Sequence, residues 1–347
     1  MTIRMSGQFQ RVSRFVRKRF ARRGLILLYH RVSQLASDPQ WLSVTPQHFA
    51  EHLEVLRGQY NLLTLKDLQQ GLRTDSMPRK TVVITFDDGY SDNLYEAKPL
   101  LERYDVPATV FVTTGKIDGS REFWWDELEA LLLESATLPD QLVFKLKDKT
   151  YSWKLDAEKT EHTSSEADQR WNVTMKRYPT PLHKVYQELA PVLKGVEESV
   201  RESVFQDLSR LAGVPRHVRY THRTLRREEL IRLEDGGLVE VGAHCVTHSV
   251  LALQPSEVQR QELVGSKKTL EEILGKPVSS FAYPFGTLAD YTPDTVEIVR
   301  QSGFTCACSN FFGVVGRSSD LFQLPRALVR DWDGDTFAKQ LEQWFCD

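Results

Sequence analysis

The feature that most restricts the fold of this 347-residue chain is the alternation of short apolar runs with longer amphipathic stretches. Runs such as 81–86 (TVVITF) are β-branched and aromatic, which is typical of strands buried in a parallel sheet. Alternating strands and helices predict such a sheet covered by helices, and seven or eight units would close a barrel with its chemistry at the carboxyl ends of the strands. We expect strands at 25–29, 61–65, 81–86, 108–113, 238–242, 280–283 and 304–308, and helices after Thr45 and at 68–72, 94–104, 256–274 and 294–302.

Residues 118–225 interrupt this alternation. Residues 142–155 alternate between apolar and polar around a polar turn, as a β-hairpin does, and residues 183–212 have helical periodicity. We interpret 118–225 as a mixed α/β insertion within one barrel domain of residues 25–347, acting as a lid or as a surface for a partner.

The first 24 residues form a separate basic segment with eight Lys or Arg and no acid. The whole chain carries a formal net charge of −2, which argues against a nucleic-acid partner, and the remainder therefore carries −2 − 8 = −10. Apolar residues recur in the segment at spacings of three and four, which predicts an amphipathic helix in peripheral contact with an anionic membrane. The alternatives are a solvated tail or a helix packed on its own barrel. The apolar residues are Met5, Phe9, Val12, Val16 and Phe20.

Neither a secretory signal nor a membrane-spanning helix is expected, because charges interrupt the segment and no apolar run approaches about 18 residues. The four cysteines have neither a disulfide-like nor a zinc-ribbon spacing. We therefore expect reduced thiols and a cytoplasmic protein, with membrane association through residues 1–24 as a further expectation.

Three short motifs follow predicted strands. Asp87-Asp88-Gly89 offers one carboxylate for a metal and one for a base, although a solvated turn would explain it alone. His244 and His248 would converge on one point if they shared a helical turn, and with one carboxylate they make a three-ligand metal set. The loop at 283–286 (YPFG) can aim a backbone N–H at an oxyanion, or it can be a simple proline turn.

Together these motifs resemble those of the polysaccharide deacetylases, carbohydrate esterase family 4. The resemblance rests on residues 85–90 (TFDDGY), 244–248 (HCVTH) and 281–286 (FAYPFG), in the family's order, and it covers about residues 25–117 and 226–330. Residues 29–32 (YHRV) also resemble the opening of one bacterial branch of the family. The resemblance implies a distorted (β/α) barrel of about seven strands and hydrolysis of N-acetyl groups on a carbohydrate.

The resemblance also implies roles for the site residues. Asp88, His244 and His248 would hold a divalent metal, for which we expect zinc. Asp87 would be the general base, and the backbone N–H of Phe285 would stabilise the oxyanion. We expect substrate contacts from Tyr90, Tyr283, Pro284 and Gly286, and we weigh Trp124 and Trp125 as sugar platforms against the alternative that they belong to the core.

This chain departs from the family's pattern at two positions. Many members have an arginine that orients the base where this chain has Ala282, and we expect Arg326 to serve instead. Many members take their general acid from a late histidine, but no histidine follows His248. The branch with the Tyr-His motif implies His30 as the acid, and His217 and His222 remain the alternatives.

Other functions are compatible with parts of this pattern. Two histidines and one carboxylate also form the facial triad of non-haem iron oxygenases, although the paired Asp87-Asp88 disfavours that reading. A non-sugar amidohydrolase could use the same scaffold, since fold does not fix substrate, and a binding module without catalysis would not need every ligand and the base. The expected substrate is an N-acetylhexosamine glycan or its precursor, including lipid-linked forms.

Overall fold

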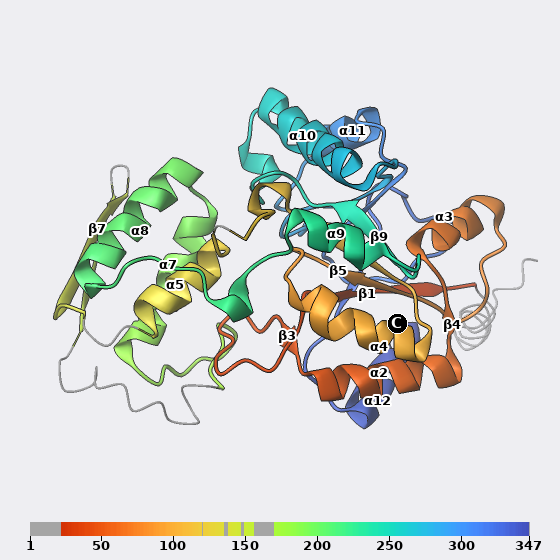
Figure 1. Cartoon of the computed structure of the whole chain (residues 1–347), viewed down its shortest axis with the longest axis horizontal. Coiled ribbons are helices and arrows are strands. Elements are labelled where there is room, and N and C mark those ends of the chain that lie inside the picture. Colours follow the sequence, from red (N-terminus) through yellow and green to blue (C-terminus); the bar gives the residue numbers. More distant parts are fainter. Residues whose placement is uncertain (1–21, 120, 135–137, 147–148, 156–169, 347) are drawn as a thin grey trace, which may run out of the picture.

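A curled parallel sheet forms the centre of the computed structural model, which describes residues 22–119, 121–134, 138–146, 149–155 and 170–346 (Figure 1). The predicted amphipathic helix of the basic segment therefore lies outside the described residues. Along the sheet the strand order is β11-β10-β9-β6-β5-β1-β12, and β4 pairs with the start of β5. The strands are β1 (Gly24–Tyr29), β4 (Asn61–Leu62), β5 (Thr81–Phe86), β6 (Ala108–Val112), β9 (Val239–Ala243), β10 (Ser280–Ala282), β11 (Cys306–Cys308) and β12 (Ala327–Leu328).

This sheet confirms the predicted distorted (β/α) barrel. All of its strand pairs are parallel. Among the described residues, no ladder joins the edge strands β11 and β12, and one bridge links Cys308 of β11 to Leu324 in the segment before β12. The sheet is therefore curled without being a fully closed barrel. Leu25 and Leu27 of β1 pack in one apolar cluster and Ile26 in another, so both faces of this strand are covered. Burial on both faces explains why the strand sequences are continuously apolar.

The strand register places the ends of neighbouring strands side by side. β1 pairs with β5 from Gly24–Thr81 through Tyr29–Phe86, so the next residues, His30 and Asp87, leave the sheet at the same edge. β6 pairs with β9 up to Val112–Ala243, which brings His244 to that edge. The carboxyl ends of the strands thus gather residues that are far apart in sequence.

Helices cover the outside of the sheet, and their ends follow ordinary capping rules. Thr45 caps α2, where its side chain accepts a hydrogen bond from the His48 N–H and proline occupies the first turn. α10 ends at Gly275, whose φ of +66° favours glycine. The helices are α2 (Pro46–Gln59), α3 (Leu65–Thr74), α4 (Lys98–Tyr104), which continues the π-helix η1 (Asn93–Ala97), α9 (Arg227–Glu234), α10 (Ser256–Leu274), α11 (Pro293–Gln301) and α12 (Gly334–Cys346).

Between β6 and β9 the chain leaves the sheet and builds a second group of elements beside the barrel (Figure 1). A hairpin forms there as predicted, and the helical stretch at 183–212 is divided into two helices. These elements share an apolar core of their own, which includes Leu142, Tyr186, Leu189 and Phe205. They are α5 (Trp124–Leu132), β7 (Gln141–Leu146), β8 (Lys149–Lys154), α7 (Pro181–Lys194) and α8 (Glu198–Ala212). We call this group the insertion, and its boundaries at 118 and 225 remain a prediction from the sequence.

The remaining short elements are β2 (Arg31–Val32), which pairs with β3 (Ser43–Val44), and the 3₁₀ turns η2 (Thr114–Lys116), η4 (Tyr220–His222) and η5 (Leu251–Leu253). In the described part of the chain, no helix is both long enough and apolar enough to cross a membrane. Cys245, Cys306 and Cys308 are buried free cysteines.

Candidate active site

A cavity of about 580 Å³ opens at the carboxyl ends of the strands. Asp87 and Asp88 after β5, His244 and His248 after β9, and Phe285 after β10 all line it. Barrel enzymes place their chemistry at this end of the sheet.

Three of these residues have a backbone conformation that side chains rarely adopt. The φ angles of Asp88, His248 and Phe285 are +74°, +58° and +59°. Such strain is tolerated only where the surrounding structure enforces it, and it is frequent at functional sites. The segment between the two histidines is a bend and not the helical turn that we considered, because Cys245 also has a positive φ, +62°.

Asp88, His244 and His248 form one compact group of buried side chains. The Nε2 atoms of His248 and His244 lie 3.2 Å and 3.6 Å from the same oxygen, Oδ1 of Asp88. The side chains are at most 5 % exposed. Burial alone would raise the pKa of Asp88, but the two neighbouring imidazoles lower it.

The contacts of His244 are those of a ring that faces a cation or a proton in this group. Its Nδ1 lies 2.7 Å from the Ala282 carbonyl, which can only accept, so Nδ1 carries the proton. In a neutral ring, Nε2 then directs its lone pair toward carboxylate oxygens of Asp88 and Asp87 at 3.6 Å and 3.9 Å. Acceptors facing acceptors repel each other unless a cation or a proton lies between them. Two imidazoles and one carboxylate are the donor set of a catalytic zinc site with an open position, so the residues present fit a divalent metal.

The loop between the two histidines is held by a buried carboxylate on α10. Glu262 Oε2 accepts hydrogen bonds from the backbone N–H groups of Val246 (2.9 Å) and Thr247 (2.8 Å), and Oε1 accepts one from the Thr247 hydroxyl (2.8 Å). The sequence analysis missed Glu262, because the position of a glutamate in a predicted helix does not show that its side chain contacts a distant loop.

Asp87 is paired with Arg326, the residue that we expect to replace the family's arginine. The guanidinium donates two hydrogen bonds of 2.7 Å, one to each carboxylate oxygen of Asp87. Burial alone would raise the pKa of Asp87, whereas Arg326 and His244 lower it, so the carboxylate is ionised. An oriented, ionised carboxylate beside the metal position is suited to remove a proton from water.

The loop that carries Phe285 is fixed by Asn310. Its backbone N–H donates to the Gly286 carbonyl (2.7 Å), and its side-chain amide donates to the Phe285 carbonyl (3.1 Å). A Cβ on Gly286 would lie 2.8 Å from the Asn310 nitrogen, so this close approach requires glycine. The Phe285 ring lies 4.6 Å from the His248 ring.

Of the three candidate acids, only His30 lines the cavity, and its Nδ1 has no hydrogen-bond partner among the described residues. Burial lowers its pKa, while Asp88 and Asp87 raise it. His222 is buried in a network with Glu129, and His217 lines a different surface depression. The structure thus brings His30 to the same cavity as Asp87 and Asp88.

The comparisons with known proteins agree with this geometry. A family model described as polysaccharide deacetylase matches residues 74–143 and 178–307, which include all three motifs. The chain belongs to the polysaccharide deacetylase family. The match leaves out residues 144–177, which lie within the insertion, and nothing in it tests the branch with the Tyr-His motif.

Among sequence relatives, the Bacillus subtilis (strain 168) protein YxkH, itself assigned to the polysaccharide deacetylases, is 38 % identical over 104 residues. The alignment covers 29 % of this chain and 36 % of YxkH. A poly-beta-1,6-N-acetyl-D-glucosamine N-deacetylase of Staphylococcus aureus is 34 % identical over 77 residues, 22 % of this chain and 26 % of that enzyme. The similarity thus spans about a third or less of these relatives.

A solved structure that shares the fold is IcaB from Ammonifex degensii, with a TM-score of 0.58 and 18 % identity over 94 % of this chain and 98 % of that one. The deacetylase PplD of Streptococcus pyogenes, solved with acetate, gives a TM-score of 0.57 and 17 % identity over 92 % and 99 %. At this identity the likeness concerns the fold alone.

Two of the expected substrate contacts, Tyr90 and Tyr283, are wrong, because both side chains are buried. The Tyr90 side chain is fully buried, where its hydroxyl donates to Asp126 (2.7 Å) and accepts from the Trp125 indole. The Tyr283 ring stacks on Tyr291, and its hydroxyl donates to the Phe322 carbonyl. The hydroxyl of each tyrosine is thus hydrogen-bonded inside the protein and does not face the cavity. Neither Pro284 nor Gly286 lines the cavity, and both instead shape the Phe285 loop.

The insertion supplies cavity residues that sequence reasoning missed or left open. Trp124 and Trp125 line the cavity from α5, and α7 adds Gln187 and Lys194. The α7 residues recur at helical spacing on a polar face, a signal that the sequence contained but that does not reveal what the face contacts. Gln40, Asn310 and Arg330 also line the cavity and were not predicted.

A second buried group, Asp126, Glu129 and His222, also brings possible metal ligands within 4.8 Å of one another. Here the positive charge already comes from arginine, because Arg219 lies 3.3 Å from Glu129 Oε2. Asp126 is occupied by the Tyr90 hydroxyl. The group at Asp88 is therefore the better metal site.

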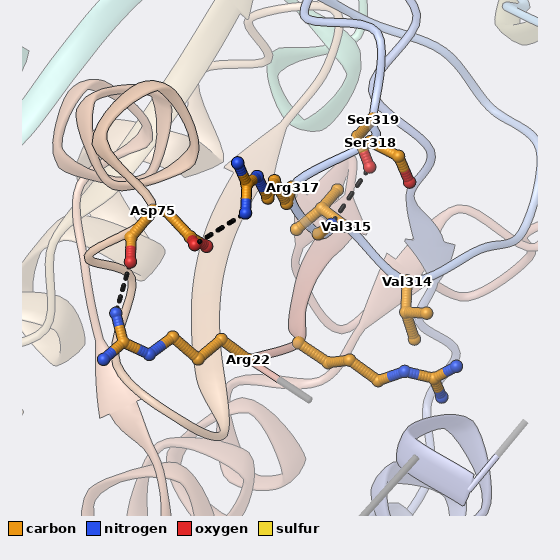
Figure 2. Close-up of a pocket in the computed structure, with 9 residues that line it drawn as sticks. Arg22, Asp75, Val314, Val315, Arg317, Ser318 and Ser319 are labelled. Atoms are coloured by element: carbon orange, nitrogen blue, oxygen red, sulfur yellow. Dashed lines mark hydrogen bonds and ion pairs between the residues drawn. The ribbon is translucent and has the colours of Figure 1, made fainter. Parts of the chain in front are cut away.

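A larger cavity, about 880 Å³, is lined by Arg22 just before β1, by Asp75 after α3 and by residues 314–319. Figure 2 shows Arg22 and Arg317 directed toward Asp75, to which both donate hydrogen bonds. Among the described residues, its lining includes no histidine or cysteine and one carboxylate, so these residues offer no metal set. Size alone does not identify the functional site.

Proposed function

We propose that this polysaccharide deacetylase hydrolyses N-acetyl groups on a carbohydrate in a metal-dependent reaction, with an N-acetylhexosamine glycan or glycan precursor as substrate. The observation that carries the proposal is the meeting of the Asp88–His244–His248 group with the Asp87–Arg326 pair at one cavity. The staphylococcal relative, named for deacetylation of a β-1,6-linked N-acetylglucosamine polymer, supports the substrate class.

Asp88, His244 and His248 would hold the metal, and zinc suits this mixture of nitrogen and oxygen donors. A bound divalent cation lowers the pKa of water and polarises a carbonyl group. The family's preference for such a metal and the orientation of the His244 lone pair both support this assignment.

The protein's own groups then act in sequence. Asp87, held ionised by Arg326, removes a proton from the attacking water. The backbone N–H of Phe285 donates to the oxygen on which negative charge develops. His30, on the wall of the same cavity, delivers a proton to the departing sugar amine. The products are acetate and an amino sugar.

The test is acetate release from a panel of N-acetylated sugars, before and after treatment with a chelator. We expect release that the chelator abolishes and added zinc restores. Asp88→Ala, His244→Ala and His248→Ala should each lose bound metal while keeping the fold, and the exposed His217→Ala should keep both metal and activity. Full metal occupancy in the three ligand variants would refute the assignment, and oxygen uptake by the loaded enzyme would favour an oxygenase instead.

A further inference from the structure

Arg330 is a cation of the catalytic cavity that the proposed mechanism does not use. The strand register places it next to His30. β1 and β12 pair at Leu28 and Leu328, and the Val329 N–H donates to the Leu28 carbonyl (3.0 Å). Two positions further along these parallel strands, His30 and Arg330 leave the sheet at the same edge, and both line the cavity. Arg330 therefore lies on the side from which the sugar amine departs in the proposed reaction.

The guanidinium of Arg330 is held by a turn that Asp38 closes. Its carbon lies 4.6 Å from the centre of the Trp41 ring, and one of its nitrogens donates to the Trp41 carbonyl. Trp41 has a φ of +56°, which side chains rarely adopt, and its N–H donates to the Asp38 carbonyl (3.0 Å). The Asp38 carboxylate accepts from the N–H groups of Leu42 (3.0 Å) and Ser43 (2.7 Å). The arginine is thus positioned before a ligand binds.

Arg330 forms no ion pair within the described part of the chain. Apart from the proposed metal ligands, the other charged side chains of the cavity are paired. Asp87 is bound by Arg326, and Lys194 Nζ lies 2.6 Å from Oδ1 of Asp290. A cation that is partly withdrawn from water and has no counter-charge is unfavourable, so an anion is its natural partner in this cavity.

The guanidinium still has donors to offer. Burial lowers the pKa of Arg330, and the charge of Asp38 opposes this effect without cancelling it. The hydrogen bond to the Trp41 carbonyl uses one of five N–H groups. No nitrogen of Arg330 is among the buried polar atoms that lack a partner, so the remaining N–H groups are accessible to a ligand. A guanidinium with free donors binds phosphate and carboxylate groups in two-pronged pairs.

We propose that Arg330 recognises an anionic group, a phosphate or a carboxylate, on the amino sugar itself, so that the preferred substrate is an acidic N-acetylhexosamine. The position beside His30 puts this group on the sugar that keeps the amine and not on the acetyl group that leaves. A neutral polymer of N-acetylglucosamine, as named for the staphylococcal relative, leaves the charge of Arg330 without a partner. This inference rests on the proposed function and adds the charge of its substrate.

The experiment compares sugars that differ in charge, with the zinc-loaded full-length protein. Acetate release is measured from N-acetylglucosamine, its 1-phosphate, its 6-phosphate and N-acetylmuramic acid, which carries a carboxylate, so the source of the charge is distinguished. We expect a higher kcat/KM for at least one acidic sugar than for N-acetylglucosamine. Arg330→Gln should reduce this ratio about 10–100-fold, the range expected for a hydrogen bond between charged groups. Arg330→Lys keeps the charge and should reduce it less.

Arg300 on α11 provides the matched control. It is also an arginine stacked on an aromatic ring, with 4.2 Å between its guanidinium carbon and the centre of the Phe322 ring, but it does not line the cavity. Arg300→Gln should therefore leave the ratio unchanged. Zinc content and circular dichroism of each variant show whether the metal and the fold are retained.

The outcomes separate this inference from the proposed function. Acetate release without a preference for any acidic sugar, or only from neutral chains, would overturn the inference alone. This comparison needs no variant, so it holds even if Arg330→Gln does not fold. A preference that persists in Arg330→Gln would also overturn the inference, because the metal or another group then recognises the charge. If no N-acetylated sugar releases acetate, the proposed function fails and the inference fails with it.

Discussion

Arg326 and Asp87 are 239 residues apart in sequence, yet they form a two-pronged ion pair with both hydrogen bonds at 2.7 Å. The arginine precedes β12 and the aspartate follows β5, and β1 lies between these strands in the sheet. The Arg326 side chain is fully buried and also donates to the Ser309 carbonyl (2.8 Å). An arginine just before the edge strand β12 thus fixes a carboxylate that follows β5, two strands away.

Arg326→Lys should keep the fold and lower kcat about 10–100-fold with little change in KM. The lysine retains the charge but loses the planar pair of donors, so Asp87 is oriented less well in the transition state. Arg326→Ala should cost about 3–5 kcal/mol of unfolding free energy, because it leaves Asp87 buried without a partner. Steady-state kinetics and urea unfolding measure the two effects, and a normal kcat in Arg326→Lys would contradict this role.

Asp87→Asn should lower turnover about 10²–10⁴-fold, the usual effect of removing a general base. The amide has nearly the same shape but cannot accept the proton. Metal content should stay at the wild-type level, since Asp88 and not Asp87 is assigned as the ligand. Metal analysis alongside acetate release tests this, and loss of metal would mean that Asp87 is a ligand.

Much of the fold was predictable from sequence because the relevant patterns are local. Continuous apolar runs such as 81–86 signal a strand covered on both faces, and Thr45-Pro46 signals a helix start, and both predictions are confirmed. The motifs that follow the strands could be assigned to one site, because the carboxyl ends of parallel strands lie at the same edge of the sheet. Strand register, which brings His30 beside Asp87, then agreed with that expectation.

The errors concern the directions of side chains, which depend on packing between distant segments. Tyr90 lies beside the motif aspartates, yet its hydroxyl is used by Asp126 and Trp125 of the insertion. No pattern within residues 85–90 reveals those partners. Similarly, Gln187 and Lys194 lie on the polar side of an amphipathic helix, where sequence alone predicts solvent and the structure places the cavity.

Glu262→Ala should weaken metal affinity about 10–100-fold while keeping all three proposed ligands, because groups that orient ligands typically have effects of this size. The carboxylate accepts three hydrogen bonds from residues 246 and 247, and these residues set the distance between His244 and His248. Competition with a chromophoric chelator measures the affinity. Glu257→Ala, on the exposed first turn of the same helix, is the matched control, and an equal affinity in the two variants would refute the effect.

The buried carboxyls of α5 should make stability fall as the pH rises. Burial raises the pKa of Asp126 to about 7 and that of Glu129 to about 8, against the opposing effects of Arg31 and Arg219. In the unfolded chain these groups titrate near pH ~4, so between about pH 4 and 8 the folded state binds more protons. Their stabilising contribution is complete below the unfolded values and is lost toward pH 7–8.

Urea unfolding at about pH 5 and about pH 8 tests this sign, with a slope of at most about 1.4 kcal/mol per pH unit for each group. Asp126→Asn keeps an acceptor for the Tyr90 hydroxyl but cannot titrate, so it should lose less stability than the wild type over this range. An equal loss in both proteins would show that Asp126 titrates normally.

We assign the general acid to His30. His30 lines the cavity together with Asp87 and Asp88, and its Nδ1 has no partner among the described residues. If His30 had only a packing role, we would expect its Nδ1 to form a hydrogen bond with a backbone carbonyl, as His244 Nδ1 does with Ala282. The geometry therefore favours transfer of a proton to the substrate.

His30→Ala is assayed on two substrates, one with a sugar amine as leaving group and one acetate ester with a phenolate leaving group. A phenolate departs without protonation, whereas an amine does not, so loss of the acid should reduce turnover far more for the amine, by about 10²–10⁴-fold. The exposed His217→Ala should affect neither substrate. If His30→Ala lowers both rates by the same factor, His30 only supports the cavity wall and the proton must come from another group.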